Sequence, residues 1–287
     1  MTPQSHSEHQ SPEPENPKPR VTVVVVSHDR QTMLRACLEK LEKSEGRERL
    51  QIVVVDNGSI DGSAQLDADF PNVQWIRLPK NFGLTKAMNL GWRAADAEYV
   101  FFLHDDTEVP PDAAIRLADV LDANTDAAAV CPLLVDREGK PAPQLGTLPF
   151  DGKWRPANPS GDAPTPVEYP RSAALMARVF YVKANRQIDE RFGQFGGDAD
   201  LAAQFKRASK KVLLAPAVRV FHSGARNYDG LEKADRLLAH AAFLSKYSGF
   251  FAGLMARLTA ILGALFGFRF GELRYMLAGQ KIDGTQS

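Results

Sequence analysis

The fold is decided by the stretch Tyr99-Val-Phe-Phe-Leu-His-Asp-Asp-Thr-Glu108, which changes from apolar to acidic at its midpoint. The β-branched and aromatic run predicts a strand buried on both faces, and Pro110-Pro111 end it. Two adjacent carboxylates at the end of a buried strand are costly unless a positive charge neutralises them. Two interpretations stay open here: a divalent cation that carries a phosphate ester, or a solvated acidic loop.

Two further apolar runs precede this stretch, at residues 20–27 and 50–55. The first ends in Ser27-His-Asp-Arg and the second in Asp56-Asn-Gly-Ser. Residues 31–43 between them carry apolar side chains at helical spacing. Strand, helix and strand in this order predict a parallel βαβ unit, in which ligands bind beyond the carboxyl ends of the strands. For Asp56, a turn residue is the alternative to a ligand contact.

Composition excludes several classes of protein. The 287 residues have a formal net charge of zero and a pI of about 7.0, which does not indicate a nucleic-acid partner. The two cysteines lie in apolar contexts, which indicates buried thiols in a reducing compartment. Residues 1–20 are polar and Pro-rich without an apolar signal segment, so we expect a disordered tail and a cytoplasmic location.

A turn and a helix lie between these strands and the acidic stretch. Asn81 and Gly83 predict a turn whose backbone approaches a ligand closely. Residues 85–95 predict a helix that carries Lys86 in its first turn. A contact from Lys86 to a phosphate and an ordinary exposed lysine are the two interpretations.

Four motifs in one order resemble glycosyltransferase family 2, and most of all its rhamnosyltransferase-like bacterial members. They are Val23-Val-Val-Val-Ser-His, Val-Val-Val-Asp56-Asn-Gly-Ser, Asn81-Phe-Gly-Leu-Thr-Lys-Ala-Met-Asn-Leu-Gly and Phe-Leu-His-Asp-Asp106. The resemblance implies an α/β fold of the GT-A type, with a Rossmann-like, mostly parallel central sheet flanked by helices. The resemblance runs from about Val21 to about Gly249. We expect a catalytic domain at residues 21–225 and a C-terminal helical segment at residues 226–287.

The same resemblance assigns the donor and metal residues. Asp106 would bind a divalent metal, Mn²⁺ or Mg²⁺, together with His222, which follows the final strand. Asp105 would contact the ribose, and Asp56 with the loop formed by Ser27 and Asp29 would hold the nucleobase. Asn81 and Lys86 complete the predicted donor site. His104 occupies the first position of the usual Asp-x-Asp signature, and this departure leaves the full ligand set open.

The catalytic base is implied by a second motif, Gly197-Asp-Ala-Asp-Leu201. Asp198 takes the position of the base, and Asp200 that of a supporting residue at the helix start, where a carboxylate is usually a cap. Gly197 replaces the glutamate of the family pattern.

The implied activity is an inverting, metal-dependent transfer of a sugar from a nucleotide diphosphate sugar to a glycan or lipid-linked acceptor hydroxyl. Cell-surface polysaccharide synthesis is the implied process. The alternative is a non-catalytic domain that binds sugar nucleotides or acts as a scaffold, motivated by His104 and Gly197. A nucleotidyltransferase would need a glycine-rich phosphate loop, which Ser27-His-Asp-Arg lacks.

Two segments have more than one interpretation. Residues 136–170 predict a long loop, which the family resemblance places beside the acceptor. Trp154 in this loop either stacks on a sugar or anchors the loop to the core. Residues 250–268 are nearly apolar around Arg257. We expect peripheral contact with the inner face of a membrane through residues 250–274, or a buried or homodimer-forming helix.

Overall fold

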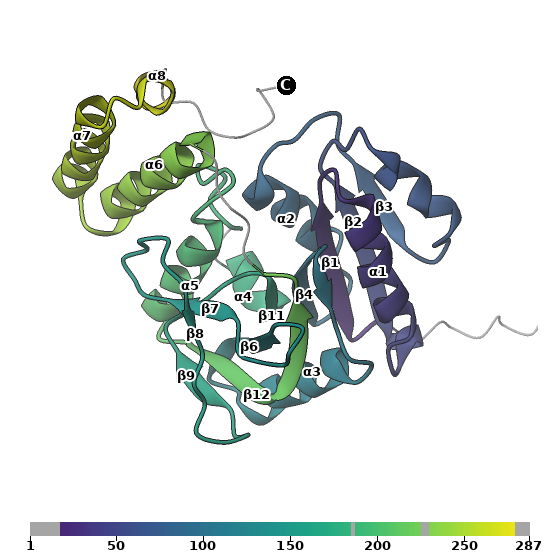
Figure 1. The fold of residues 1–287 in the computed structure, drawn as a ribbon. Helices are drawn as coiled ribbons and strands as arrows, with labels where there is room; N and C mark the ends of the chain where they lie inside the picture. The colour runs from purple at the N-terminus through teal and green to yellow at the C-terminus, as the bar shows by residue number, and fades with distance from the viewer. Residues whose placement is uncertain (1–17, 185–186, 225–229, 279–287) are drawn as a thin grey trace, which may run out of the picture.

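The computed structural model describes residues 18–184, 187–224 and 230–278 (Figure 1). Most of the predicted disordered tail and the predicted boundary at 225 therefore lie outside the described residues. The strands are β1 Val21–Ser27, β2 Leu50–Asp56, β3 Gln74–Arg77, β4 Tyr99–His104, β5 Thr107–Glu108, β6 Ala127–Val135, β7 Pro143–Gly146, β8 Arg155–Pro156, β9 Thr165–Val167, β10 Tyr169–Pro170, β11 Ala174–Arg178 and β12 Lys211–His222. The helices are α1 Gln31–Glu42, α2 Leu84–Arg93, α3 Ala113–Ala123, α4 Val179–Ala184, α5 Gly197–Arg207, α6 Gly230–Tyr247, α7 Phe250–Phe266 and α8 Phe270–Ala278, with 3₁₀ turns η1 Arg47–Arg49 and η2 Gly62–Ala68.

The central sheet has the order β3-β2-β1-β4-β11-β6-β12-β5. Its first four strands are parallel, as are β6 and β12, whereas β11 runs antiparallel to both β4 and β6. Helices cover both faces (Figure 1). The predicted α/β class, with a largely parallel sheet between helices, is confirmed.

Strand β1 shows how the sequence builds two cores. Val23 and Val25 pack on one face, in the cluster that contains Leu34 of α1. Val24 packs on the other face with α2. A Cβ added at Gly91 of α2 would lie 2.2 Å from Val24 Cγ1, so this glycine lets α2 pack closely against the sheet.

The register of the sheet brings the polar strand ends together. Ser27 at the end of β1 pairs with Asp56 at the end of β2, and Val26 pairs with His104 at the end of β4. From the far side of the sheet, His222 at the end of β12 pairs with Thr107 of β5. Residues remote in sequence therefore meet at one edge.

The segment predicted as an unstructured loop contains strands. Within residues 136–170, β7 pairs with β8 and β10 in a small second sheet, and β9 adds to β12. These strands are two to four residues long and contain prolines, which edge strands tolerate. Strands this short show no hydrophobic periodicity, so the sequence did not indicate them. Residues 211–222 form one strand with a register shift between Ala215 and Arg219.

Three C-terminal helices lie beside the catalytic fold (Figure 1). The described residues contain no helix that is both long and apolar enough to cross a membrane.

Candidate active site

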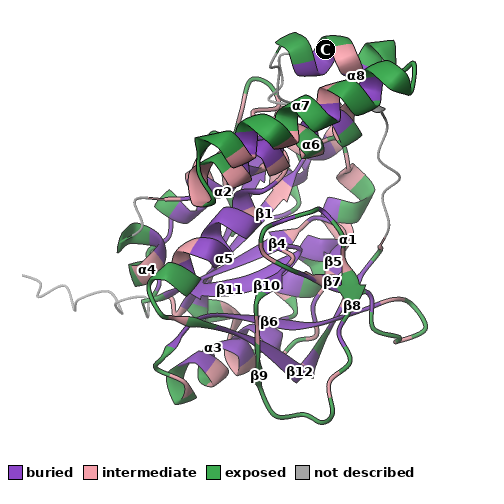
Figure 2. Ribbon diagram, turned by 90° about the vertical axis from the view of Figure 1, so that its left-hand side faces the viewer, coloured by how far each residue is buried: buried purple, intermediate pink, exposed green. Residues whose placement is uncertain are grey.

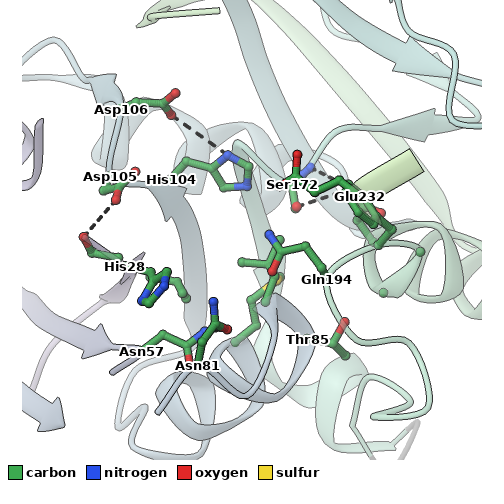
Figure 3. Close-up of a pocket in the computed structure, with 18 of the residues that line it drawn as sticks. His28, Asn57, Asn81, Thr85, His104, Asp105, Asp106, Ser172, Gln194 and Glu232 are labelled. Atoms are coloured by element: carbon green, nitrogen blue, oxygen red, sulfur yellow. Dashed lines mark hydrogen bonds and ion pairs between the residues drawn. The ribbon is translucent and has the colours of Figure 1, made fainter. Parts of the chain in front are cut away.

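A cavity of about 730 Å³ lies at the polar edge of the sheet. Its walls come from the loops after β1, β2 and β4, from the start of α5, and from the first turns of α6. Figure 3 shows Asp105 and Asp106 on one side, with Asn57 and Asn81 below and Ser172 opposite. The cavity therefore gathers most of the residues that the sequence predicted for the site.

A potential metal site lies at the end of β4. One ligand atom from each of His104, Asp106 and His222 lies within 4.8 Å of the others. Asp106 Oδ1 lies 3.3 Å from His222 Nε2 and 4.0 Å from His104 Nδ1. Both ring nitrogens of His222, His104 Nε2 and Asp106 Oδ1 are buried without a hydrogen-bond partner among the described residues. Buried nitrogen and oxygen lone pairs that converge in this way fit a divalent cation.

The protonation states favour metal binding. Burial and the charge of Arg171 lower the pKa of His104 to about 3, so its imidazole is neutral. Burial opposes ionisation of Asp106, but the contacts with His222, His104 and Ser223 outweigh it and lower its pKa. A neutral imidazole and an ionised carboxylate are the forms that ligate metals.

Asp105 is held by the loop after β1. Ser27 Oγ donates a hydrogen bond of 2.8 Å to Asp105 Oδ2, and Arg30 Nη1 lies 3.2 Å from Asp105 Oδ1 and 3.3 Å from Asp106 Oδ2. Burial raises the pKa of Asp105 to about 6, although Arg30 and Ser27 oppose this shift. Arg30 ends the motif Ser27-His-Asp-Arg, but no sequence pattern marked it as a site residue.

Asp198 lies in the first turn of α5 and lines the cavity. Its Oδ1 accepts a hydrogen bond of 2.7 Å from the hydroxyl of Tyr169, and Ser172 Oγ lies 3.3 Å from Oδ2. These contacts fix the carboxylate in orientation while it faces the open cavity. The role of Asp198 as base stays a prediction, and its placement is compatible with that role.

The close packing of α2 explains why residue 197 is a glycine. A Cβ at this position would lie 2.3 Å from Oγ1 of Thr85, which is buried at the start of α2. At the same junction, the Thr85 amide donates to the carbonyl of Gly193 at 3.1 Å. A side chain at position 197 would therefore collide with α2, which packs directly against α5.

The loops after β2 and β3 are joined by two asparagines. Asn57 Nδ2 donates to Asn81 Oδ1 at 2.9 Å, and Asn57 Oδ1 accepts from the Phe82 amide at 2.9 Å. Both side chains line the cavity. Gly58 has a φ of 77°, and a Cβ there would lie 2.3 Å from the Lys80 carbonyl carbon, so the two loops touch through it.

Three residues predicted for donor binding make contacts with other parts of the protein, namely Asp29, Asp56 and Lys86. Asp29 lines the cavity but accepts a bond of 2.7 Å from the Ile60 amide. Asp56 does not line it and accepts from the Ser59 amide at 2.9 Å, which is the turn role left open above. Lys86 Nζ lies 4.3 Å from the centre of the Phe82 ring, also outside the cavity lining. Their roles in donor binding stay predictions.

Part of the cavity wall comes from the segment predicted as a loop. Trp154 lines the cavity, with its ring centre 4.9 Å from that of Tyr169 and 5.8 Å from the Arg171 guanidinium carbon. Tyr169 of β10 and Arg171, which follows that strand, were missed because a two-residue strand shows no periodicity. Asp200 does not cap α5; it is buried and accepts bonds from α6, 2.7 Å from Lys246 Nζ and 2.6 Å from the Tyr247 hydroxyl.

Known proteins resemble this chain in sequence and in fold. The O-antigen biosynthesis protein RfbC of Myxococcus xanthus is 27% identical over 253 residues, which cover 78% of this chain and 19% of that protein. The undecaprenyl-phosphate 4-deoxy-4-formamido-L-arabinose transferase of Proteus mirabilis is 28% identical over 114 residues, which cover 37% of this chain and 35% of that protein. The chain thus spans a fifth to about a third of these two relatives.

The crystal structure of GalNAc-T7 with UDP, GalNAc and Mn²⁺ aligns with a TM-score of 0.66 at 16% identity, over 80% of this chain and 48% of that one. At this identity the likeness shows the fold alone. The family described as Glycosyl transferase family 2 matches residues 22–181, which is more than half of the chain. With the predicted motifs and fold both in place, this chain belongs to glycosyltransferase family 2.

Proposed function

We propose that this protein is an inverting glycosyltransferase that uses a nucleotide diphosphate sugar and a divalent metal. The observation that carries the proposal is that Asp198, His104 and Asp106 line one cavity, with His222 buried behind it, 3.3 Å from Asp106. A carboxylate able to accept a proton and a site able to neutralise a diphosphate are the two groups that such a transfer needs.

The metal would be held by His104, Asp106 and His222. When bound there, it would supply a positive charge to stabilise the charge on the leaving diphosphate. Two imidazole ligands favour Mn²⁺ over Mg²⁺, and the Mn²⁺ in the GalNAc-T7 structure supports this choice. Arg30, which lies against both Asp105 and Asp106, adds a cation on the same side of the cavity.

Asp198 acts as the general base. It takes the proton from the acceptor hydroxyl while the acceptor oxygen forms a bond to the anomeric carbon. The bond from that carbon to the diphosphate breaks on the opposite face, so the configuration inverts and the nucleoside diphosphate leaves with the bonding electrons. Tyr169 and Ser172 hold the carboxylate in place and thereby fix the line of attack.

The acceptor is a hydroxyl on a glycan or a lipid-linked sugar, in cell-surface polysaccharide synthesis. The names of the two relatives, one of O-antigen biosynthesis and one acting on undecaprenyl phosphate, support this class. Trp154 on the cavity wall offers a ring for sugar stacking. The cytoplasmic location expected from the sequence is part of the same proposal.

The test measures release of nucleoside diphosphate from uridine, thymidine and guanosine diphosphate sugars with Mn²⁺ and the purified full chain. Asp198→Asn is expected to lose at least about 100-fold in turnover, as for removal of a general base, with donor affinity unchanged. The matched control is Asp162→Asn, at an exposed carboxylate on the loop before β9, which is expected to keep full activity.

Two results would contradict the proposal. Turnover retained in Asp198→Asn would remove this residue as base. Tight donor binding without release from the native chain, in the presence and absence of acceptor sugars, would favour the non-catalytic alternative. The anomeric configuration of the product, read by NMR, tests inversion separately.

A further inference from the structure

Helix α7 exposes a continuous apolar face. Its exposed large side chains recur at helical spacing, so they share one side of the helix, termed here the outer face (Figure 2). The outer face consists of Phe250, Phe251, Leu254, Met255, Leu258, Leu262, Leu265 and Phe266. Phe268 and Phe270 continue it towards α8. Contiguous apolar surface of this extent marks an interaction site.

The opposite side of α7 explains why the outer face cannot turn inward. Its buried residues are small, namely Gly253, Ala260 and Ala264. A Cβ at Gly253 would lie 2.6 Å from the Ala241 carbonyl oxygen of α6, so the two helices are in close contact. Rotation of α7 would drive phenylalanine and leucine side chains into α6. The sequence therefore dictates which side is exposed.

The exposed charges of the described residues 249–278 are all positive. Among described residues 249–278 the only acid is Glu272, which is 9% exposed and lies 2.8 Å from Arg269. Arg257, Arg269 and Arg274 are exposed on α7, on the link after it and on α8. The apolar face thus has a basic surround without an exposed acid in this range.

We propose that the outer face of α7 docks on an anionic lipid surface, with the helix lying in the plane of the interface. Apolar side chains on one side and flanking arginines are the features of such helices. At 17 residues α7 is about 25 Å long, which is shorter than a hydrocarbon core of about 30 Å, so it lies on the surface rather than across it.

A second copy of this chain fits the outer face less well. A two-fold interface places the same patch on itself, so the basic surround of one copy would meet that of the other with no exposed acid from this range to pair with it. An anionic lipid surface complements both the apolar and the basic residues.

This docking goes beyond the proposed transfer reaction and also fits it. Leu231, Glu232 and Arg236 of α6 line the cavity, while α6 packs against α7 on another side. One helix therefore separates the cavity from the docking face. Vesicle binding requires neither donor nor turnover, so its failure is distinguishable from failure of the proposed reaction.

The experiment is co-sedimentation of the full chain with vesicles of phosphatidylcholine alone or mixed with phosphatidylglycerol. We expect binding to the anionic vesicles that weakens as salt rises. The double variant Phe251→Ser/Met255→Ser is expected to lower the partition coefficient at least about tenfold, because two exposed side chains no longer enter the interface. Phe180→Ser is the matched control, since Phe180 on α4 is 72% exposed and Phe251 is 78% exposed.

A second variant keeps the proposal testable if the double variant misfolds by circular dichroism. Arg274→Glu, at an exposed position, is expected to weaken binding to anionic vesicles severalfold. Native chain that stays in the supernatant at every lipid composition would overturn the proposal. So would equal binding to neutral and anionic vesicles, or a dimer in sedimentation velocity that the double variant converts to monomer.

Discussion

Adding a single methyl group at residue 197 is expected to destabilise the contact between α2 and α5. In Gly197→Ala the new Cβ would lie 2.3 Å from Thr85 Oγ1 and 3.1 Å from Thr85 Cγ2. Thr85 is 2% exposed and β-branched, so it has little freedom to change rotamer. Overpacking of this kind costs about 1–3 kcal/mol.

A double-mutant cycle isolates the contact. Thr85→Ala removes the two nearest atoms and leaves only its own Cβ, 3.2 Å from the added Cβ. We therefore expect Gly197→Ala to be tolerated in the Thr85→Ala background, with a coupling free energy of about 1–2 kcal/mol. Urea unfolding of the four chains, compared at constant m, measures it. Gly161→Ala is the control, because a Cβ there meets nothing within 4 Å.

Additive changes in the free energy of unfolding for the two substitutions would refute a steric contact between residue 197 and Thr85. So would a Gly197→Ala chain as stable as the native chain. A functional consequence follows from the same contact. Gly197→Glu restores the acid of the family motif but is expected to lower turnover, because it displaces the first turn of α5, which carries Asp198.

Two further predictions concern charge. His104→Ala is expected to weaken Mn²⁺ binding, measured by calorimetry, at least about tenfold, which is the scale of loss for groups that support a metal site. His28→Ala, in the same cavity, is the control and is expected to leave the Mn²⁺ affinity unchanged. Burial opposes ionisation of Asp189, but bonds from Arg191 and Lys246 outweigh it and hold its pKa below the ordinary value. This stabilisation is present above the unfolded pKa of about 3.9 and is lost as pH falls below it, so between pH 5 and pH 3 the urea midpoint of the native chain should fall more than that of Asp189→Asn. Unchanged Mn²⁺ affinity in the first case, or equal falls in the second, would contradict them.

The central sheet was predictable because its signals are local. The valine runs of β1 and β2 indicate strands by composition, and the parallel arrangement follows from the helix between them. The polar strand ends then had to meet at one edge, and the register of Ser27 with Asp56 bears this out. Metal ligation by His222 came only from the family resemblance and stays a prediction.

The site residues that the sequence did not reveal depend on tertiary contacts. His104 was left unexplained because strand β4 by itself gives no reason for a histidine; its reason is the proximity of Asp106 and His222. Arg171 lies after a two-residue strand that no period can reveal. In the sequence, Gly197 only stands where the family pattern has a glutamate. Its structural role is visible in its close contact with Thr85 on another helix.

A buried carboxylate is one of the contacts that join the C-terminal helices to α5. Asp200 is completely buried next to the segment that carries Asp198, and Lys246 and Tyr247 of α6 donate to it. A buried carboxylate that loses such partners costs about 3–5 kcal/mol, so α6 cannot leave α5 without destabilising the start of that helix. Because α6 also packs against α7, any surface that holds the outer face is linked through these helices to α5, which carries the base of the proposed reaction.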